Sequence, residues 1–131
     1  MHPPQDMYTI QQAADRAGVT IATLRYYEQE GLLRDIQRLP NGHRRYSDQD
    51  IAWLEFLNCM RESGMPIQAL KRYVSLCHQP GTGRARCDLL TDHRDVVKDK
   101  MAALQTQLER IESKIGWYED ALAEQALEAN A

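Results

Sequence analysis

Apolar positions in the first 31 residues recur at the three- and four-residue spacing of amphipathic helices. Two short helices are predicted, one starting after Thr9 and one running from Thr20 to Gly31. A threonine hydroxyl can cap a helix by accepting from free backbone N–H groups of its first turn, and a glycine can end a helix in the left-handed backbone conformation. Gly18 predicts a tight turn between the two helices. The pattern therefore favours a helix-turn-helix motif, whose second helix normally enters the major groove of DNA.

A basic hairpin is predicted directly after these helices. Pro40-Asn41-Gly42 is a strong turn sequence, because proline restricts φ and Asn-Gly accepts positive φ. Between Ile36 and Tyr46 the chain carries three arginines and no acidic residue. This composition predicts a wing beside the helix-turn-helix, able to contact phosphates.

Two further helices are predicted after the hairpin. Ser47 has the residue type of an N-cap for the third, and Asp50, three residues later, completes a variant of the capping box. Pro66 is expected in the first turn of the fourth helix, where its missing N–H costs nothing. Residues 79–86 contain proline and two glycines and predict a linker.

From residue 88 to residue 122 the apolar pattern changes to heptads. The apolar positions are separated alternately by four and three residues: Val97, Met101, Leu104, Leu108, Ile111, Ile115, Tyr118 and Leu122. A helix of this length measures about 50 Å, at ~1.5 Å per residue, which is too long for so small a body to cover. The seam therefore predicts a coiled coil with a second copy of the chain and an obligate dimer. The alternative is a lone helix folded onto its own domain.

Length and charge refine this picture. At 131 residues the chain suits one compact domain with an extension. The net charge is −3, but residues 1–78 hold nine basic and nine acidic side chains, whereas residues 79–131 hold seven basic and ten acidic ones. A basic wing on a neutral body can still engage phosphates.

We expect a cytoplasmic protein that does not enter a membrane. No apolar run is long enough to span a bilayer. The N-terminal sequence MHPPQDM lacks the basic start and apolar core of a signal peptide. Three irregularly spaced cysteines suit a reducing compartment better than a disulfide framework.

Four segments of the chain, YTIQQAA, TLRYYEQEGLL, NGHRRYSDQDI and LNCMRESGMPIQALKRYV, resemble the MerR family of transcription regulators. The similarity is dense over residues 7–78 and continues more loosely to Leu122. The long C-terminal run is similar to the branch that answers aldehydes and other thiol-reactive electrophiles, and less similar to the metal-sensing branch. His43 departs from the pattern, because family members usually carry tyrosine there. Its planar polar ring predicts a changed contact rather than a lost one.

The resemblance implies a mainly α fold. A winged helix-turn-helix DNA-binding domain is expected over residues 7–78, followed by a linker over residues 79–86. Residues 87–123 are expected to form the dimerisation helix, and the resemblance implies that it pairs as an antiparallel coiled coil. Residues 124–131 are expected to be a disordered tail.

The expected DNA contacts lie on the second helix, the wing and the fourth helix. Arginine can read guanine or hold a phosphate, and a tyrosine hydroxyl commonly bonds phosphate. The expected contacts are Thr23, Arg25, Tyr26, Arg38, His43, Arg44, Arg45, Tyr46, Lys71 and Arg72. Several have alternatives: Tyr26 and Tyr27 as packing residues, and Arg45, Lys71 and Arg72 as solvated surface.

Two cysteines are candidate sensing residues. Cys59 falls where the resemblance to the electrophile-responsive branch includes a cysteine, although the negative end of its helix dipole opposes a thiolate. Packing as a small buried residue is the alternative for Cys59. Cys87 is expected at the start of the long helix, with flanking arginines that favour a thiolate. Cys77 and Cys87, with two nearby histidines, would form a zinc-type site only if the linker folds back.

The sequence contains no catalytic constellation and no cofactor motif, so we expect a non-enzyme. We expect a homodimeric regulator of palindromic promoter DNA, with RNA polymerase as its partner at the promoter. The resemblance implies that it activates by bending and untwisting a long-spacer promoter, in response to electrophile, aldehyde or thiol stress. A metal- or oxidant-responsive regulator using Cys77 and Cys87 is the runner-up. A coiled-coil adaptor, and a thiol enzyme or metal carrier, are alternatives from other classes.

Overall fold

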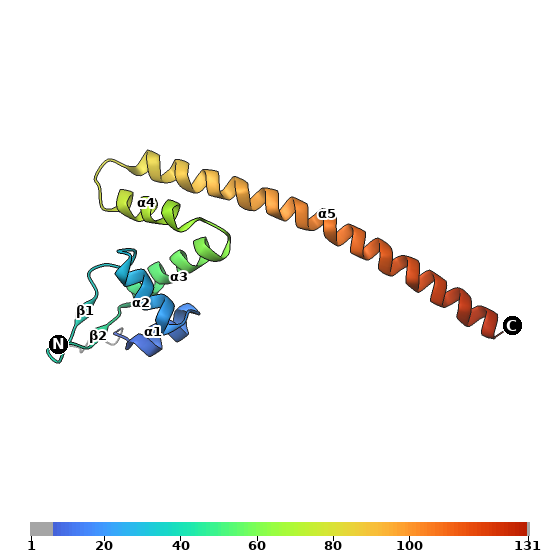
Figure 1. The fold of residues 1–131 in the computed structure, drawn as a ribbon, viewed down its shortest axis with the longest axis horizontal. Coiled ribbons are helices and arrows are strands. Elements are labelled where there is room, and N and C mark those ends of the chain that lie inside the picture. The colour runs from blue at the N-terminus through green and yellow to red at the C-terminus, as the bar shows by residue number, and fades with distance from the viewer. Residues whose placement is uncertain (1–6, 131) are drawn as a thin grey trace. The chain divides into compact units, whose positions relative to one another are not determined.

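A computed structural model describes residues 7–130 of the chain (Figure 1). The described part is mainly helical and includes a short antiparallel sheet of two strands. In chain order the elements are α1 (Ile10–Ala17), α2 (Ile21–Gln29), β1 (Gln37–Arg38), β2 (Arg44–Arg45), α3 (Asp48–Glu62), α4 (Ile67–Cys77) and α5 (Gly83–Ala129). Within residues 7–130 no helix is long and apolar enough to cross a membrane.

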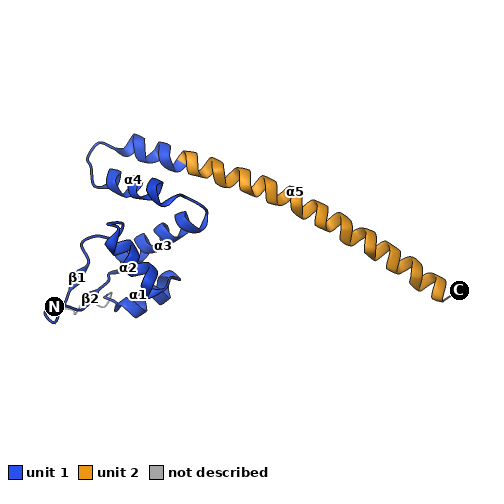
Figure 2. Ribbon diagram, viewed as in Figure 1, with its two compact units in different colours: residues 1–90 blue, residues 91–131 orange. Residues whose placement is uncertain are grey.

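The chain divides into two compact units (Figure 2). Unit 1, residues 1–90, contains the four shorter helices, the sheet and the first turns of α5. Unit 2, residues 91–131, contains the remainder of α5. The predicted fold class, an N-terminal helix-turn-helix followed by a long helix, is confirmed.

Three helices of unit 1, namely α1, α2 and α3, begin at the caps that the sequence predicted. Thr9, Thr20 and Ser47 precede α1, α2 and α3, and each side-chain oxygen accepts from a first-turn amide at 3.0 to 3.2 Å. Gly18, between α1 and α2, has a φ of 72°, and Gly31, after α2, has a φ of 75°. Both angles lie in the left-handed region that glycine adopts without strain. The local chemistry of the sequence therefore determines where the helices of the helix-turn-helix start and turn.

The core of unit 1 is made by apolar side chains from all four short helices, the segment after α2, the residue after β2 and the turn between α3 and α4. Its fully buried members include Leu24, Leu32, Tyr46, Leu54, Leu57, Met65, Leu70 and Val74. Leu89 and Leu90, on the first turns of α5, pack against this core from its edge. Burial of a large apolar side chain stabilises a fold by about 1.5–3 kcal/mol, so this cluster holds the helix-turn-helix and its two supporting helices together.

The sheet forms the wing, and the residue that follows it is bonded to Tyr8, shortly before α1. Arg38 of β1 pairs with Arg44 of β2 in the antiparallel ladder. Immediately after β2, Tyr46 exchanges two backbone hydrogen bonds with Tyr8, at 2.7 and 2.8 Å. The Arg16 guanidinium of α1 lies over the Tyr8 ring, 4.3 Å from its centroid. The wing is therefore connected to α1 through the residues just before that helix.

Three predicted boundaries differ from the structure. The long helix begins at Gly83, inside the expected linker, because the Thr82 carbonyl accepts from the Arg86 amide at 2.9 Å and starts the helix there. It continues to Ala129 through most of the expected disordered tail, where alanine, glutamate and leucine are strong helix formers. Pro66 is the N-cap of α4 rather than a residue of its first turn.

Candidate nucleic-acid interface

Helix α2 has one buried face and one exposed face. Leu24 and Tyr27 are buried in the core, with Tyr27 only 3% exposed. Arg25 is exposed, and Tyr26 is 42% exposed. Thr23 is half-buried, and its hydroxyl bonds the Thr20 hydroxyl at 2.9 Å within the helix cap. Of the predicted contacts on this helix, Arg25 and Tyr26 are therefore presented to solvent, while Thr23 belongs partly to the cap. The packing alternative holds for Tyr27 and not for Tyr26.

The wing tip is closed by its own backbone and by one asparagine. Leu39 and His43 are joined by a backbone hydrogen bond of 2.8 Å, and the Asn41 side chain accepts from the His43 amide at 3.0 Å. Gly42 has a φ of 86°, which the Asn-Gly sequence predicts. The side chains of Arg38 and His43 are exposed. The tip therefore presents a cation and a polar ring on a rigid turn.

The carboxylate of Glu28 joins α2 to the wing. The Tyr46 hydroxyl donates to Glu28 Oε1 at 2.5 Å, and Arg44 Nε lies 2.6 Å from Glu28 Oε2. The Glu28 side chain is 13% exposed, and Arg44 Nε is itself buried. One carboxylate thus holds two groups of the wing against the helix that carries Arg25. The sequence did not predict this role for Glu28, because nothing local relates a residue of α2 to residues sixteen and eighteen positions later.

This arrangement corrects the prediction for Tyr46 and qualifies those for its neighbours. The Tyr46 side chain is fully buried, so it positions the wing and does not reach the surface as a DNA contact. Arg44 is half-buried in its ion pair with Glu28. Arg45 is also half-buried, and its Nη1 donates to the Arg44 carbonyl at 2.9 Å.

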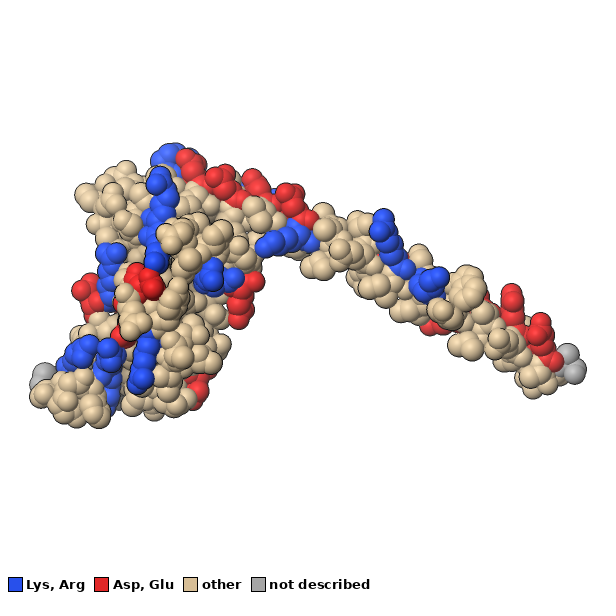
Figure 3. Space-filling model, viewed as in Figure 1, with Lys and Arg blue, Asp and Glu red and all other residues tan. Residues whose placement is uncertain are grey.

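Arg25 lies where α2 and the wing form two concave surfaces. One, of about 350 Å³, is lined by Thr9, Ile10, Arg25, Gly42, His43, Arg44 and Arg45. The other, of about 370 Å³, is lined by Arg25, Glu28, Gln29, Arg38 and Arg44. Figure 3 shows Lys and Arg side chains, in blue, gathered at the end of unit 1 that carries β1 and β2. Most of the predicted wing and helix contacts are therefore brought to one basic surface, which suits a phosphate backbone.

The two predicted contacts on α4 differ from one another. Lys71 forms an ion pair with Glu30 at the end of α2, and this contact raises the pKa of the lysine ammonium. Arg72 is exposed. Lys71 thus links α4 to the end of α2 in addition to adding positive charge. Arg72, which forms no such ion pair within residues 7–130, is the better placed of the two side chains to contact a phosphate.

Replacing Glu28 with alanine is expected to lower the free energy of unfolding by about 2–4 kcal/mol, because it leaves the buried Tyr46 hydroxyl without an acceptor and the half-buried Arg44 without its ion-pair partner. Urea unfolding measures the change. Glu55→Ala, which removes an exposed carboxylate from α3, is the matched control and is expected to change the stability by less than about 0.5 kcal/mol. Equal changes in the two variants would show that Glu28 does not hold the wing.

Stability is also expected to fall at alkaline pH through Tyr46. Burial, followed by the hydrogen bond to Glu28, raises the pKa of the Tyr46 hydroxyl, and burial raises the pKa of Tyr27 as well. An unfolded tyrosine ionises near pH ~10, so above that pH the unfolded chain releases a proton that the folded chain retains. The contribution is complete below the unfolded pKa and is lost as pH rises. Melting temperatures measured from pH ~8 to ~11 should therefore decline less steeply in Tyr46→Phe than in the parent. An equal decline would contradict this assignment.

In unit 2 the predicted seam is a continuous exposed stripe. No residue of α5 is buried in the protomer. Val97 is half-buried, and the other seven seam residues are exposed: Met101, Leu104, Leu108, Ile111, Ile115, Tyr118 and Leu122. Apolar side chains at this spacing are typical of a coiled-coil contact.

The three cysteines lie in different surroundings and form no disulfide. Cys59 on α3 is exposed, so it is not the small buried residue that the sequence allowed as an alternative. Cys87 is exposed and lies on the second turn of α5, beyond the free N–H groups expected beside it, because the helix begins at Gly83. Cys77 is half-buried at the end of α4. Residues 7–130 contain no group of three or more His, Cys, Asp or Glu side chains placed to hold a metal ion.

Comparison with known proteins gives consistent matches. Residues 8–77 match the sequence model of the MerR HTH family regulatory protein. An HTH-type transcriptional regulator of Haemophilus influenzae is 36% identical over 118 residues, which cover 88% of this chain and 87% of that protein. The HTH-type transcriptional regulator AdhR of Bacillus subtilis is 44% identical over 86 residues, or 65% of this chain and 61% of AdhR. The crystal structure of HiNmlR, a MerR family regulator lacking the sensor domain, bound to promoter DNA, aligns with a TM-score of 0.81 and 34% identity over 89% of each chain.

Proposed function

The chain belongs to the MerR family of helix-turn-helix regulatory proteins and is a transcription regulator that binds DNA, and from that premise we propose that it acts as a homodimer on a palindromic promoter site. The exposed apolar seam of α5 supports the dimer. Two-fold symmetry in the protein requires two-fold symmetry in the site, with half-sites separated by one helical turn of DNA or a multiple of it.

The observation that carries the DNA-binding mode is the attachment of the wing to α2 through Glu28. The Tyr46 hydroxyl and Arg44 Nε both contact the same carboxylate. For this reason α2 and the wing (residues 37–46) act as one rigid DNA-binding unit, which we call the reader. In this reader Arg25 and Tyr26 enter the major groove, Arg38 and His43 lie at the flanking backbone, and Arg72 adds a phosphate contact on the α4 side. Arg44 and Arg45 contribute mainly to the positive potential, because both are half-buried.

The dimer activates transcription by distorting its DNA. We assign it a promoter whose two polymerase recognition elements are separated by a long spacer, which the dimer bends and untwists so that RNA polymerase engages both. Bending a short site costs about 1–6 kcal/mol in elastic estimates, which contacts from two basic wings can offset. A modest change in the geometry of the dimer is therefore sufficient to switch the promoter.

The signal is a thiol-reactive electrophile, such as an aldehyde, and Cys59 is the residue that reacts with it. Two observations support this choice. Cys59 is exposed and accessible on α3, and α3 packs on α1 and α4 in the body that carries the reader. Addition of an organic group at Cys59 changes the surface of a helix that packs on α1 and α4.

Transcription in vitro with purified RNA polymerase, on a promoter bound by the protein, tests this function. We expect formaldehyde or acrolein to raise transcript yield in the parent and in Cys87→Ser, which removes the other exposed cysteine. In Cys59→Ser the response should be lost while DNA affinity is unchanged. A response that survives in Cys59→Ser would contradict the assignment of Cys59. An electrophile-independent transcript yield in the parent would contradict the signal itself.

A further inference from the structure

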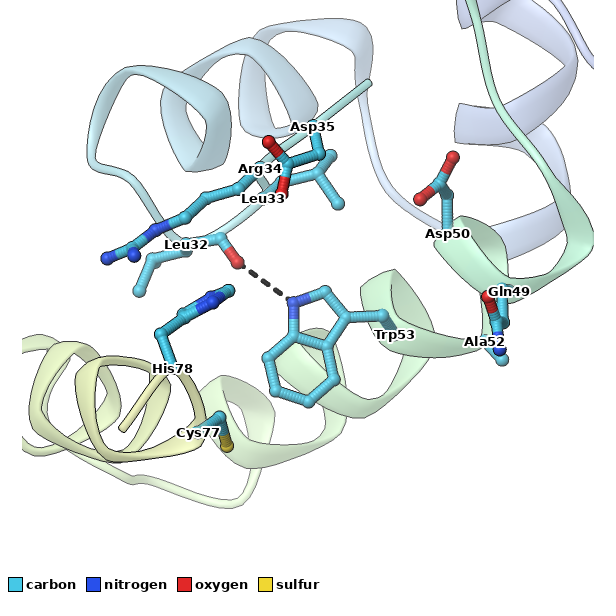
Figure 4. Close-up of a pocket in the computed structure, with 10 residues that line it drawn as sticks. All are labelled: Leu32, Leu33, Arg34, Asp35, Gln49, Asp50, Ala52, Trp53, Cys77 and His78. Carbon is cyan, nitrogen blue, oxygen red and sulfur yellow. Dashed lines mark hydrogen bonds between the residues drawn. The ribbon is translucent and has the colours of Figure 1, made fainter. Parts of the chain in front are cut away.

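A pocket of about 530 Å³ lies in unit 1, and none of its lining residues belongs to β1, β2 or the turn between them (Figure 4). It is bounded by the segment after α2, the first half of α3 and the end of α4. The lining residues are Leu32, Leu33, Arg34, Asp35, Gln49, Asp50, Ala52, Trp53, Cys77 and His78. Its volume is in the range of small-molecule sites, which are mostly apolar with a few polar groups. Neither DNA binding nor the coiled-coil seam uses this pocket.

One wall of the pocket is the indole of Trp53, held in a single orientation. Its Nε1 donates to the Leu32 carbonyl at 2.9 Å. The ring is stacked on Phe56 and on Tyr73, with centroids 5.5 and 6.2 Å away and an interplanar angle of 22° in each case. Because the indole N–H is already bonded, Trp53 offers a ligand a flat apolar face rather than a donor. Such a face favours a planar, unsaturated molecule.

The thiol of Cys77 lines the same pocket, at the end of α4 next to His78 (Figure 4). Burial raises the pKa of the Tyr73 hydroxyl, the neighbouring Cys77 thiol raises it further through charge and a hydrogen bond, and the Arg86 guanidinium lowers it. Arg86 is held in place by its hydrogen bond from Nε to Thr82 Oγ1, at 3.1 Å. The hydrogen bond between Cys77 and Tyr73 places a hydroxyl group beside the Cys77 sulfur.

We propose that this pocket binds a small aromatic α,β-unsaturated aldehyde or ketone and that Cys77 adds covalently to it. The inference deepens the proposed function, on which its regulatory consequence rests, by naming a second reactive thiol and the ligand shape that it selects. The Trp53 face stacks on the aromatic ring of the ligand, and the half-buried thiol meets the conjugated double bond. Cys59, on open surface, has no equivalent wall and discriminates less between ring-bearing and small electrophiles.

The addition needs no further reactant. The sulfur lone pair forms a C–S bond to the β-carbon of the ligand, and the π electrons of its C=C bond move toward the carbonyl oxygen to give an enolate. The proton released by the thiol then returns to the α-carbon, which restores the carbonyl. Nothing leaves and nothing is oxidised or reduced.

One wall of the pocket is the segment that joins α2 to the wing, so a bound ligand would contact that segment. Leu32, whose carbonyl accepts from Trp53, follows α2 by three residues, and its amide bonds the Tyr27 carbonyl at 2.9 Å. Asp35, on the same wall, has a positive φ of 58°, unusual for a residue other than glycine. A ligand inserted against Trp53 therefore presses on the segment that links the recognition helix to the wing.

The test compares cinnamaldehyde, which carries a ring, with acrolein, which does not, on the full-length protein. Adducts at each cysteine are trapped by borohydride reduction and quantified by peptide mass spectrometry over time. We expect cinnamaldehyde to modify Cys77 about tenfold faster than it modifies Cys59 or Cys87, and acrolein to show no such preference. Ala52→Leu, which fills the pocket from an exposed position on α3, should remove the preference. Ala102→Leu, the same change at an exposed site of α5, should leave it intact.

Three results would overturn the proposal. The first is that Ala52→Leu and Ala102→Leu change the rate at which cinnamaldehyde modifies Cys77 to the same extent. The second is equal modification of all three cysteines by cinnamaldehyde. The third is a Cys77 that reacts only after the dimer is dissociated, which would mean that a second copy of the chain fills the pocket. None of these results changes the rise in transcript yield that acrolein is expected to cause through Cys59. Failure of this inference is therefore distinguishable from failure of the proposed function.

Discussion

Replacing Leu108 and Ile111 together with lysine is expected to convert the protein to a monomer and to weaken binding to its palindromic site by about 100- to 10,000-fold. Both side chains lie at the centre of the exposed seam, with 44% and 58% of their surface accessible in the protomer. Pairing with a second copy buries them, and each large apolar side chain so buried contributes about 1.5–3 kcal/mol. Lysines at the same positions would place like charges against one another across the seam.

The loss of affinity follows from losing the second half-site. In a dimer, binding of the first reader raises the local concentration of the second to the millimolar range, and linked binding can exceed single-site binding by about 10²–10⁴. A monomer can still bind one half-site, but it loses the affinity that comes from linked binding of the second. Sedimentation equilibrium measures the oligomeric state, and fluorescence anisotropy at a stated salt concentration measures the affinity.

The matched control adds the same charge outside the seam. Thr106 and Ser113 lie on the outer face of the heptad pattern and are exposed, so Thr106→Lys with Ser113→Lys should leave the dimer and its DNA affinity nearly unchanged. A Leu108→Lys, Ile111→Lys protein that is monomeric but binds as tightly as the parent would show that dimerisation is not required for the site.

The Arg25→Ala variant is expected to bind its operator about 10- to 100-fold more weakly, with an unchanged melting temperature. Arg25 is exposed on α2 and lines both concave surfaces between that helix and the wing, so its removal leaves no buried group without a partner. A well-placed arginine contributes about 1–3 kcal/mol of discrimination when it reads a base. Affinity measured over a range of salt concentrations separates the two possible roles of this side chain, base reading and phosphate binding.

Arg110→Ala is the control for total charge, because Arg110 is an exposed arginine on α5 outside the reader. It should change neither the affinity nor its sequence preference. If Arg25 reads a base, its loss relaxes selectivity at one position of each half-site. If it holds a phosphate, its loss lowers the affinity for all sequences and reduces the salt dependence by about one counterion. If the Arg25→Ala variant binds the operator as tightly as the parent, the proposal that α2 contacts DNA is contradicted.

Local sequence rules predicted the elements of unit 1 well. Thr9, Thr20 and Ser47 cap the helices that they were expected to cap, and Gly42 adopts the positive φ of the predicted turn. In each case the cap or turn depends on residues within four positions of one another, so the chain in that stretch already contains the whole interaction.

Interactions between distant segments were not predictable in the same way. Glu28 meets Tyr46 only because α2 and β2 pack in one particular arrangement, and a tyrosine in a basic stretch looks like a DNA contact until that packing is known. The pocket beside Trp53 likewise collects side chains from three separate segments. The start of α5 was not predictable for a different reason, because glycine is typical of linkers and Gly83 is instead the first residue of the helix.

The most direct test of the central claim is selection of binding sequences from randomised duplex DNA by the full-length protein, followed by footprinting of the selected sequences. A dimer whose two readers each combine α2 with a wing should select an inverted repeat, with half-sites one helical turn of DNA apart or a multiple of it. The footprint should show distortion at the centre of the site. Selection of single, asymmetric half-sites, or no enrichment over the starting pool, would contradict a two-fold regulator built from these residues.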